Sequence, residues 1–283
     1  MVSDLIDRRT AEYEAEQVLK VHLFPSLPIC PFRIAAEKDI IVQAKDSKDP
    51  GISGFLMRVG SVFGIQYAQH IANDGFIRFT VAHELGHYFL PEHPKQLFGD
   101  GDGIHQSRSG FVSNDRYERQ ADYFASALLM PESRFRNEIN TAGQGFAAIE
   151  ELSRRFVTSL TATAIRFAQF TDDTVAVVMS TGQSIDYCFM SDRLRDLSGI
   201  TWIKKGDLLP PAVATARFNR NQTNIEQGAT NESTCQLDDW FDGAPAVEVN
   251  EDVVGLGSYG KTLTVLFTDE DIEDDSSDDY EDD

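Results

Sequence analysis

Residues 78–91 read RFTVAHELGHYFLP and carry the H-E-x-x-H motif formed by His83, Glu84 and His87. On an α-helix, residues four apart lie on one face, so the two histidines can direct imidazole nitrogens at one Zn²⁺ ion. Glu84 is rotated about 100° from His83, where it can reach a water beside the metal without being a ligand. Pro91 ends the predicted helix. The motif therefore predicts zinc-assisted peptide hydrolysis with Glu84 as the general base.

Two residues compete for the third ligand position. His93 lies ten residues after His83, but the pattern that uses a histidine there also needs glycine at the eighth position, where this chain has Leu90. Glu118 opens the segment ERQADYFASALLMP, a second predicted helix, and would complete a site of two histidines and one carboxylate. Asp122, one turn further on, can accept an N–H from a ligand histidine and fix its tautomer. We expect Glu118 rather than His93 to be the ligand.

These two segments, RFTVAHELGHYFL and ERQADYFASALLMP, resemble the ImmA/IrrE-type zinc metallo-endopeptidases. The resemblance covers residues 55–135 closely and 132–170 loosely. It implies a zincin-like fold, zinc held by the two motif histidines and Glu118, and Glu84 as the base. The typical substrate of the family is a helix-turn-helix repressor of the Xre kind, so the resemblance implies that cleavage relieves repression, for example in a stress response. The long 91–115 segment and an acidic tail depart from the family pattern.

The rest of the sequence predicts an α+β fold with four parts. A small sheet packed on the two metal-bearing helices forms a peptidase domain, a helical bundle with helix-turn-helix spacing follows, and then come an α+β regulatory or sensing domain and a disordered tail. The predicted ranges are 1–131, 132–170, 171–268 and 269–283. Strands are expected at 32–42, 55–70, 174–179, 185–190, 201–204 and 262–267, and loops at 91–115 and 219–236.

The formal net charge of −21 is unevenly distributed. Residues 269–283 hold 11 acidic residues, and without them 35 acidic and 25 basic residues leave a net charge of −10. Such a like-charge run is typical of disorder. The acidity argues against direct nucleic-acid binding, which needs basic patches. An acidic tail is compatible with a basic DNA-binding protein as the substrate.

Three scattered cysteines indicate neither a disulfide framework nor a cysteine zinc site. The chain has no apolar run long enough to span a membrane and no apolar leader at its start, so we expect a cytoplasmic protein.

Two alternatives stay open on the sequence. The chain could be a sensor or binding module that sequesters a repressor around a structural metal, or a general peptidase of misfolded proteins. His105 lies in the predicted 91–115 loop, and we expect an exposed histidine there rather than one that lines the cleft and stabilises an oxyanion.

Overall fold

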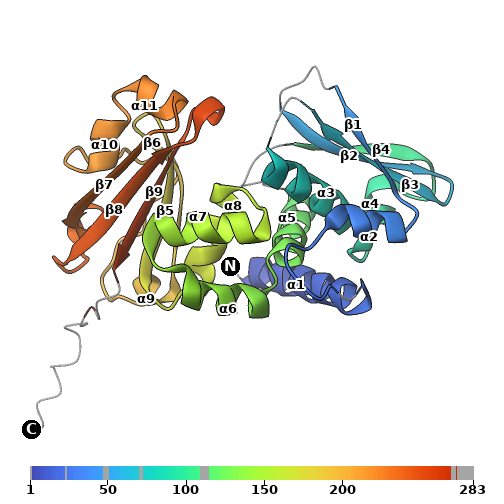
Figure 1. Cartoon of the computed structure of the whole chain (residues 1–283), viewed down its shortest axis with the longest axis horizontal. Helices are drawn as coiled ribbons and strands as arrows, with labels where there is room; N and C mark the ends of the chain where they lie inside the picture. Colours follow the sequence, from blue (N-terminus) through green and yellow to red (C-terminus); the bar gives the residue numbers. More distant parts are fainter. Residues whose placement is uncertain are drawn as a thin grey trace, which may run out of the picture. The chain divides into compact units, whose positions relative to one another are not determined.

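The computed structural model describes residues 2–22, 24–46, 51–69, 73–108, 115–268 and Ile272. The chain forms two compact units, one of residues 1–135 with 152–162 and the other of 136–151 with 163–283. Each unit combines a β-sheet with helices (Figure 1), which confirms the α+β class. Among the described helices, none is both long and apolar enough to cross a membrane.

The sheet of the first unit has four strands in the order β1-β3-β2-β4. Strand β1 pairs with β3 in parallel, and the other pairs are antiparallel. The strands are β1 (Ile41–Lys45), β2 (Ile52–Val59), β3 (Val62–Ala68) and β4 (Gly103–Arg108).

Two expectations for this region are wrong. The segment expected as a strand from residue 32 is mostly helix α2 (Pro31–Glu37), because Pro31 occupies the first turn, where its fixed φ and missing N–H favour a helix start. The expected 91–115 loop contains helix α4 (His93–Phe98) and strand β4. Backbone pairing with β2 outweighs the loop-like composition of β4.

Helix α3 (Asp74–Phe89) packs against helix α5 (Arg116–Leu129) through small residues. Gly86 of α3 has no side chain where the helices meet. A Cβ atom there would lie 3.1 Å from the Cα atom of Ala121 and 3.2 Å from the Phe124 ring. The two metal-motif segments therefore approach more closely than larger side chains would allow.

Helix α1 (Val2–His22) is tied to α5 by a buried carboxylate. Asp7 is 3 % exposed, and its Oδ1 accepts hydrogen bonds from Arg116 Nη2 at 2.6 Å and from Gln120 Nε2 at 2.8 Å. The hydrogen bond with Arg116 holds the pKa of Asp7 below its ordinary value of 3.8, although burial opposes the shift.

Three helices follow α5, namely α6 (Glu132–Ala142), α7 (Gly145–Phe156) and α8 (Leu160–Phe170). They contribute residues to both compact units. All three lie within residues 132–170, where the sequence predicts a helical bundle. Their helix-turn-helix character stays a prediction, as do the domain boundaries at residues 131, 170 and 268.

The second unit contains an antiparallel sheet in the order β6-β5-β9-β8-β7. Its core holds Val178, Trp240, Phe241 and Leu266. The strands are β5 (Thr174–Thr181), β6 (Ser184–Met190), β7 (Thr230–Gln236), β8 (Glu248–Gly255) and β9 (Thr262–Thr268). Short helical turns connect them: α9 (Asp192–Arg195), α10 (Ala214–Phe218), α11 (Gln222–Glu226), η1 (Leu237–Asp239) and η2 (Gly257–Tyr259).

Two further expectations fail in this unit. The polar 219–236 segment, expected as a mobile loop, contains α11 and the edge strand β7. An edge strand tolerates polar residues because only one side of it pairs. The expected strand at 201–204 is absent, and Thr201 donates its N–H to the carbonyl of Asp242 at 2.8 Å. The predicted tail lies outside the described residues except Ile272, which packs on this core.

We expect Gly86→Val to lower the free energy of unfolding by about 1–3 kcal/mol, because the added side chain overpacks the α3–α5 contact. Urea unfolding followed by circular dichroism measures the effect. Gly101→Ala is the matched control, since a Cβ atom at Gly101 would meet its nearest neighbour at 4.0 Å. Equal stability of the two variants would contradict a tight contact at Gly86.

We expect Asp7→Asn to cost about 1–3 kcal/mol of unfolding free energy at neutral pH, since it removes a charge-assisted buried hydrogen-bond set. The Asp7 pKa is lowered on folding, so this contribution is complete above the ordinary value of 3.8 and is lost as pH falls through the lower folded value. The stability difference between wild type and Asp7→Asn should therefore shrink in acid. Glu16→Gln, in an exposed ion pair with Lys20, should change stability little at any pH.

Candidate metal centre

Helix α3 presents the H-E-x-x-H residues toward the protein interior. Its start is capped by Asn73, whose Oδ1 accepts from the backbone N–H of Phe76 at 3.0 Å, and it ends at the residue before Leu90 and Pro91. The side chains of His83 and His87 lie one turn apart, and their Nε2 atoms are 3.1 Å from each other. Both histidines are buried.

Helix α5 brings Glu118 to the same point. Its Oε1 lies 3.2 Å from Nε2 of His87, and its Oε2 lies 3.4 Å from Nε2 of His83. Among the described residues, these three form a group whose ligand atoms all lie within 4.8 Å of one another. Asp115 caps the start of this helix by accepting from the backbone N–H of Tyr117 at 2.7 Å.

The spacing of these donor atoms fits a metal ion. Ligands at zinc-like distances around a tetrahedral centre lie roughly 3.4 Å apart. The three observed separations are 3.1, 3.2 and 3.4 Å. Two neutral imidazoles and one carboxylate are also ordinary metal ligands. The donor set thus suits a divalent ion with a free coordination position.

Electrostatics at two of the three donors, Glu118 and His87, agree with this reading. Burial opposes ionisation of Glu118, but hydrogen bonds with His105, His83 and His87 hold its pKa well below the ordinary value, so it stays a carboxylate. Burial lowers the pKa of His87 to about 3, which keeps that ring neutral. A metal needs an ionised carboxylate and neutral imidazoles.

Asp122 lies one turn beyond Glu118 and contacts the far side of His83. Its Oδ1 is 2.8 Å from Nδ1 of His83. Burial alone would lower the pKa of His83, but hydrogen bonds with Asp122 and Glu118 outweigh it and hold that pKa well above its ordinary value. A proton on Nδ1 leaves Nε2 facing the metal position.

Glu84 is not one of the three grouped donors, and its carboxylate lies close to Gly54 of β2. It is fully buried, and neither carboxylate oxygen has a hydrogen-bond partner of ordinary length among the described residues. Gly54 makes room for it, since a Cβ atom there would lie 2.6 Å from Glu84 Oε1. Burial raises the pKa of Glu84 to about 7, and the neighbouring His83 offsets part of the rise.

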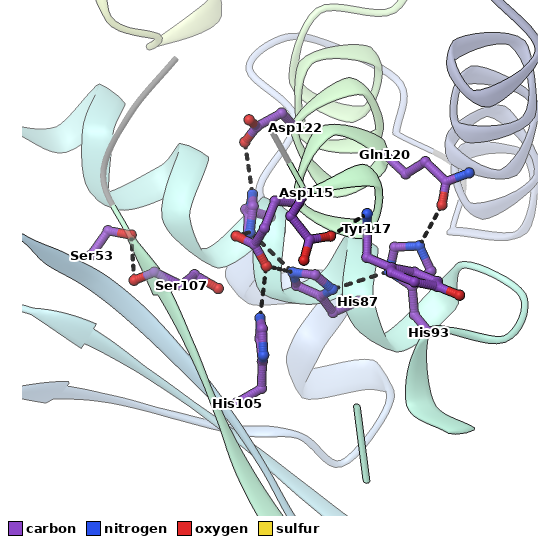
Figure 2. A network of polar contacts seen from close by, with 11 residues as sticks. Ser53, His87, His93, His105, Ser107, Asp115, Tyr117, Gln120 and Asp122 are labelled. Carbon is purple, nitrogen blue, oxygen red and sulfur yellow. Dashed lines mark hydrogen bonds and ion pairs between the residues drawn. The ribbon is translucent and has the colours of Figure 1, made fainter. Parts of the chain in front are cut away.

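His105 is not the exposed loop histidine that we expected. It lies on strand β4, is partly buried, and its Nε2 is 2.9 Å from Glu118 Oε1 (Figure 2). Its ring centroid is 4.5 Å from that of His87. His105 and Ser107 are two residues apart and pair with buried residues of β2, but the neighbouring apolar Ile104 is exposed, so no apolar alternation marks this strand in the sequence.

His93, the rival third ligand, does not join the donor group. It is fully buried on α4, and its Nδ1 lies 3.0 Å from Nδ1 of His87, on the opposite edge of that ring from the metal-facing Nε2. Its own Nε2 lies 2.9 Å from Gln120 Oε1 (Figure 2). The geometry therefore favours Glu118, and neither Gln120 nor Gly54 carried a signal in the sequence.

Comparison with known proteins gives a similar fold and a family match. A solved structure titled "Mycobacterium tuberculosis transcriptional regulator" is similar in fold, with a TM-score of 0.56 and 14 % sequence identity over 92 % of this chain and 76 % of that chain. Among curated proteins, none matches this chain. Residues 72–168, which include both metal-motif helices, match the Peptidase_M78 family, described as the IrrE N-terminal-like domain. This part of the chain therefore resembles the IrrE N-terminal-like domain, and the name of the matched family points to a metallopeptidase.

Proposed function

We propose that this protein is a zinc-dependent endopeptidase. The observation that carries the proposal is Glu84, a buried carboxylate whose oxygens make no hydrogen bond of ordinary length among the described residues, on the same helix as the two histidines of a His₂Glu donor set. Structural polar groups in a dry interior are normally satisfied, whereas catalytic ones are often held unsatisfied for a reactant.

Zinc is the ion that best suits the donor set. Three protein ligands of the types found at His83, His87 and Glu118, with one position left open, are typical of catalytic zinc. When bound, zinc supplies a Lewis acid that polarises the scissile carbonyl and acidifies a water.

Glu84 would act as the general base. A carboxylate with a pKa near the working pH can take a proton from the attacking water and later return it to the leaving amine. Gly54 has no side chain that would collide with the Glu84 carboxylate. Asp122 would hold His83 in the ligand tautomer by accepting the Nδ1 proton.

The substrate we propose is a helix-turn-helix transcriptional repressor of the Xre kind, cleaved at a specific site to relieve repression, as in a stress response. Support comes from the resemblance of the two metal-motif segments to the ImmA/IrrE enzymes, and one similar fold bears the name of a transcriptional regulator. Residues 171–268 would then sense a signal or regulate cleavage. The chain itself would act on the repressor protein and not bind DNA directly.

Substitution of Glu84 and Glu118 separates catalysis from metal binding. We expect Glu84→Gln to keep the metal but lower the cleavage rate by about 10²–10⁴-fold, because the amide cannot accept the proton. Glu118→Ala should lose the metal, because it removes the only carboxylate of the donor set. Metal content by atomic emission and cleavage of a peptide substrate measure the two effects.

The matched control is Glu16→Gln, an exposed glutamate on α1, which should retain both metal and activity. Full proteolysis by Glu84→Gln would refute the assignment of the base. Retention of stoichiometric zinc by Glu118→Ala would instead refute the third ligand.

Purified protein should cleave a candidate repressor in the presence of zinc, and a chelator should stop the cleavage. Mass spectrometry of the fragments tests for a single site. Binding without chelator-sensitive cleavage would favour the alternative of a sequestering module. Cleavage of unfolded casein as fast as the repressor would favour a general peptidase.

A further inference from the structure

A continuous series of side-chain hydrogen bonds runs from the back of His87 to helix α1. His87 Nδ1 lies 3.0 Å from His93 Nδ1, and His93 Nε2 lies 2.9 Å from Gln120 Oε1. Gln120 Nε2 donates to Asp7 Oδ1 at 2.8 Å. Asp7 in turn accepts from Arg116, with Nη2 at 2.6 Å. Figure 2 shows His93 lying between His87 and Gln120.

At the α1 end of this series, the chemical nature of the groups fixes which one donates each hydrogen bond and which one accepts it. A guanidinium can only donate, and an ionised carboxylate can only accept. Asp7 therefore takes an N–H from Gln120, which turns the Gln120 carbonyl oxygen toward His93. If the amide were flipped, its oxygen would face the Asp7 carboxylate and its NH₂ group would lose that acceptor.

The same order of donors and acceptors fixes which nitrogen carries the proton in both imidazole rings. The Gln120 oxygen accepts a proton from His93 Nε2, so the neutral His93 ring has its lone pair on Nδ1. Nδ1 of His87 must then carry the proton between the two rings, which leaves the His87 lone pair on Nε2. In the opposite direction, His93 Nε2 and Gln120 Oε1 would be two acceptors 2.9 Å apart.

The series is shielded from water from His87 to Asp7, whereas the Arg116 side chain at its end is 60 % exposed. His87 and His93 are 0 % exposed, Asp7 is 3 % exposed and Gln120 is 9 % exposed. The Tyr117 ring packs edge-on against His93 with 5.0 Å between ring centroids. Solvent cannot supply a substitute acceptor at these positions, so the side chains themselves must set the tautomer.

We propose that His93, Gln120 and Asp7 are positioning residues that lock His87 in the Nδ1–H tautomer, so that its Nε2 lone pair faces the metal. His93 thus acts through a ligand and is not a ligand itself. Tight metal binding then requires that α1 pack against α5, although Asp7 lies far from the proposed metal ligands in the sequence. The metal-affinity part of this inference rests on the proposed zinc site.

The direction of the series can be reversed by a single substitution. In Gln120→Lys the ammonium group can only donate to His93 Nε2, which forces His93 to donate to His87 Nδ1 and places the His87 proton on Nε2. The combined change Gln120→Glu and Asp7→Asn is the matched control. It preserves the net charge and the direction, because the new amide donates to the new carboxylate.

Long-range ¹H–¹⁵N spectra of metal-free protein labelled at the histidine rings report the His87 tautomer, and competition with a chromophoric chelator reports zinc affinity. We expect the Nδ1–H form in wild type and in the paired control. Gln120→Lys should shift His87 to the Nε2–H form and weaken zinc binding about 10–100-fold. The wild-type tautomer and affinity in Gln120→Lys would overturn the proposal.

His93→Phe provides a second test if circular dichroism shows that Gln120→Lys does not fold. It keeps a ring of similar shape but removes the acceptor of the His87 proton. Zinc affinity should therefore fall about 10–100-fold, as in Gln120→Lys. Unchanged zinc affinity in a folded His93→Phe protein would overturn the proposal. Because the tautomer is read without metal or substrate, a protein with the expected tautomer that cleaves no repressor would refute only the peptidase function.

Discussion

The close approach of helices α3 and α5 at Gly86 is the constraint on which the metal centre depends. Two histidines come from α3 and the carboxylate from α5, so the distance between the helix axes decides whether Glu118 can reach both rings. A Cβ atom at Gly86 would already lie 3.2 Å from the carbonyl oxygen of Ala121. The close packing of the two helices is thus also what brings the donor atoms into position.

Burial then imposes a second requirement, because polar groups removed from water need partners. Each donor of the group has a partner behind it: Asp122 for His83, His93 for His87 and His105 for Glu118. Glu84 differs from these donors, because neither of its carboxylate oxygens makes a hydrogen bond of ordinary length among the described residues. A buried carboxylate without a partner costs stability, so its retention is best explained by a reactant that completes its hydrogen bonds.

The part of the fold that follows helical periodicity was predictable from the sequence. The helices around the motif and around Glu118 form where expected, since local propensity and proline or cap signals coincide there. Strands β4 and β7 were missed because their sequences, GIHQSR and TNESTCQ, are polar and short. They become strands only because β2 and β8 offer unpaired backbone groups. His105 was therefore misplaced along with the strand that carries it.

The sequence by itself determined the chemistry of the site, since the four-residue spacing of His83 and His87 fixes two donors on one helix face whatever surrounds them. Tertiary structure alone decided the rest. It places Glu118 rather than His93 beside the Nε2 atoms of the two motif histidines, because the path of α4 turns His93 to the back of the His87 ring. It also set the direction of the hydrogen bonds that reach Asp7, because direction depends on which donors and acceptors face each other across elements far apart in the chain.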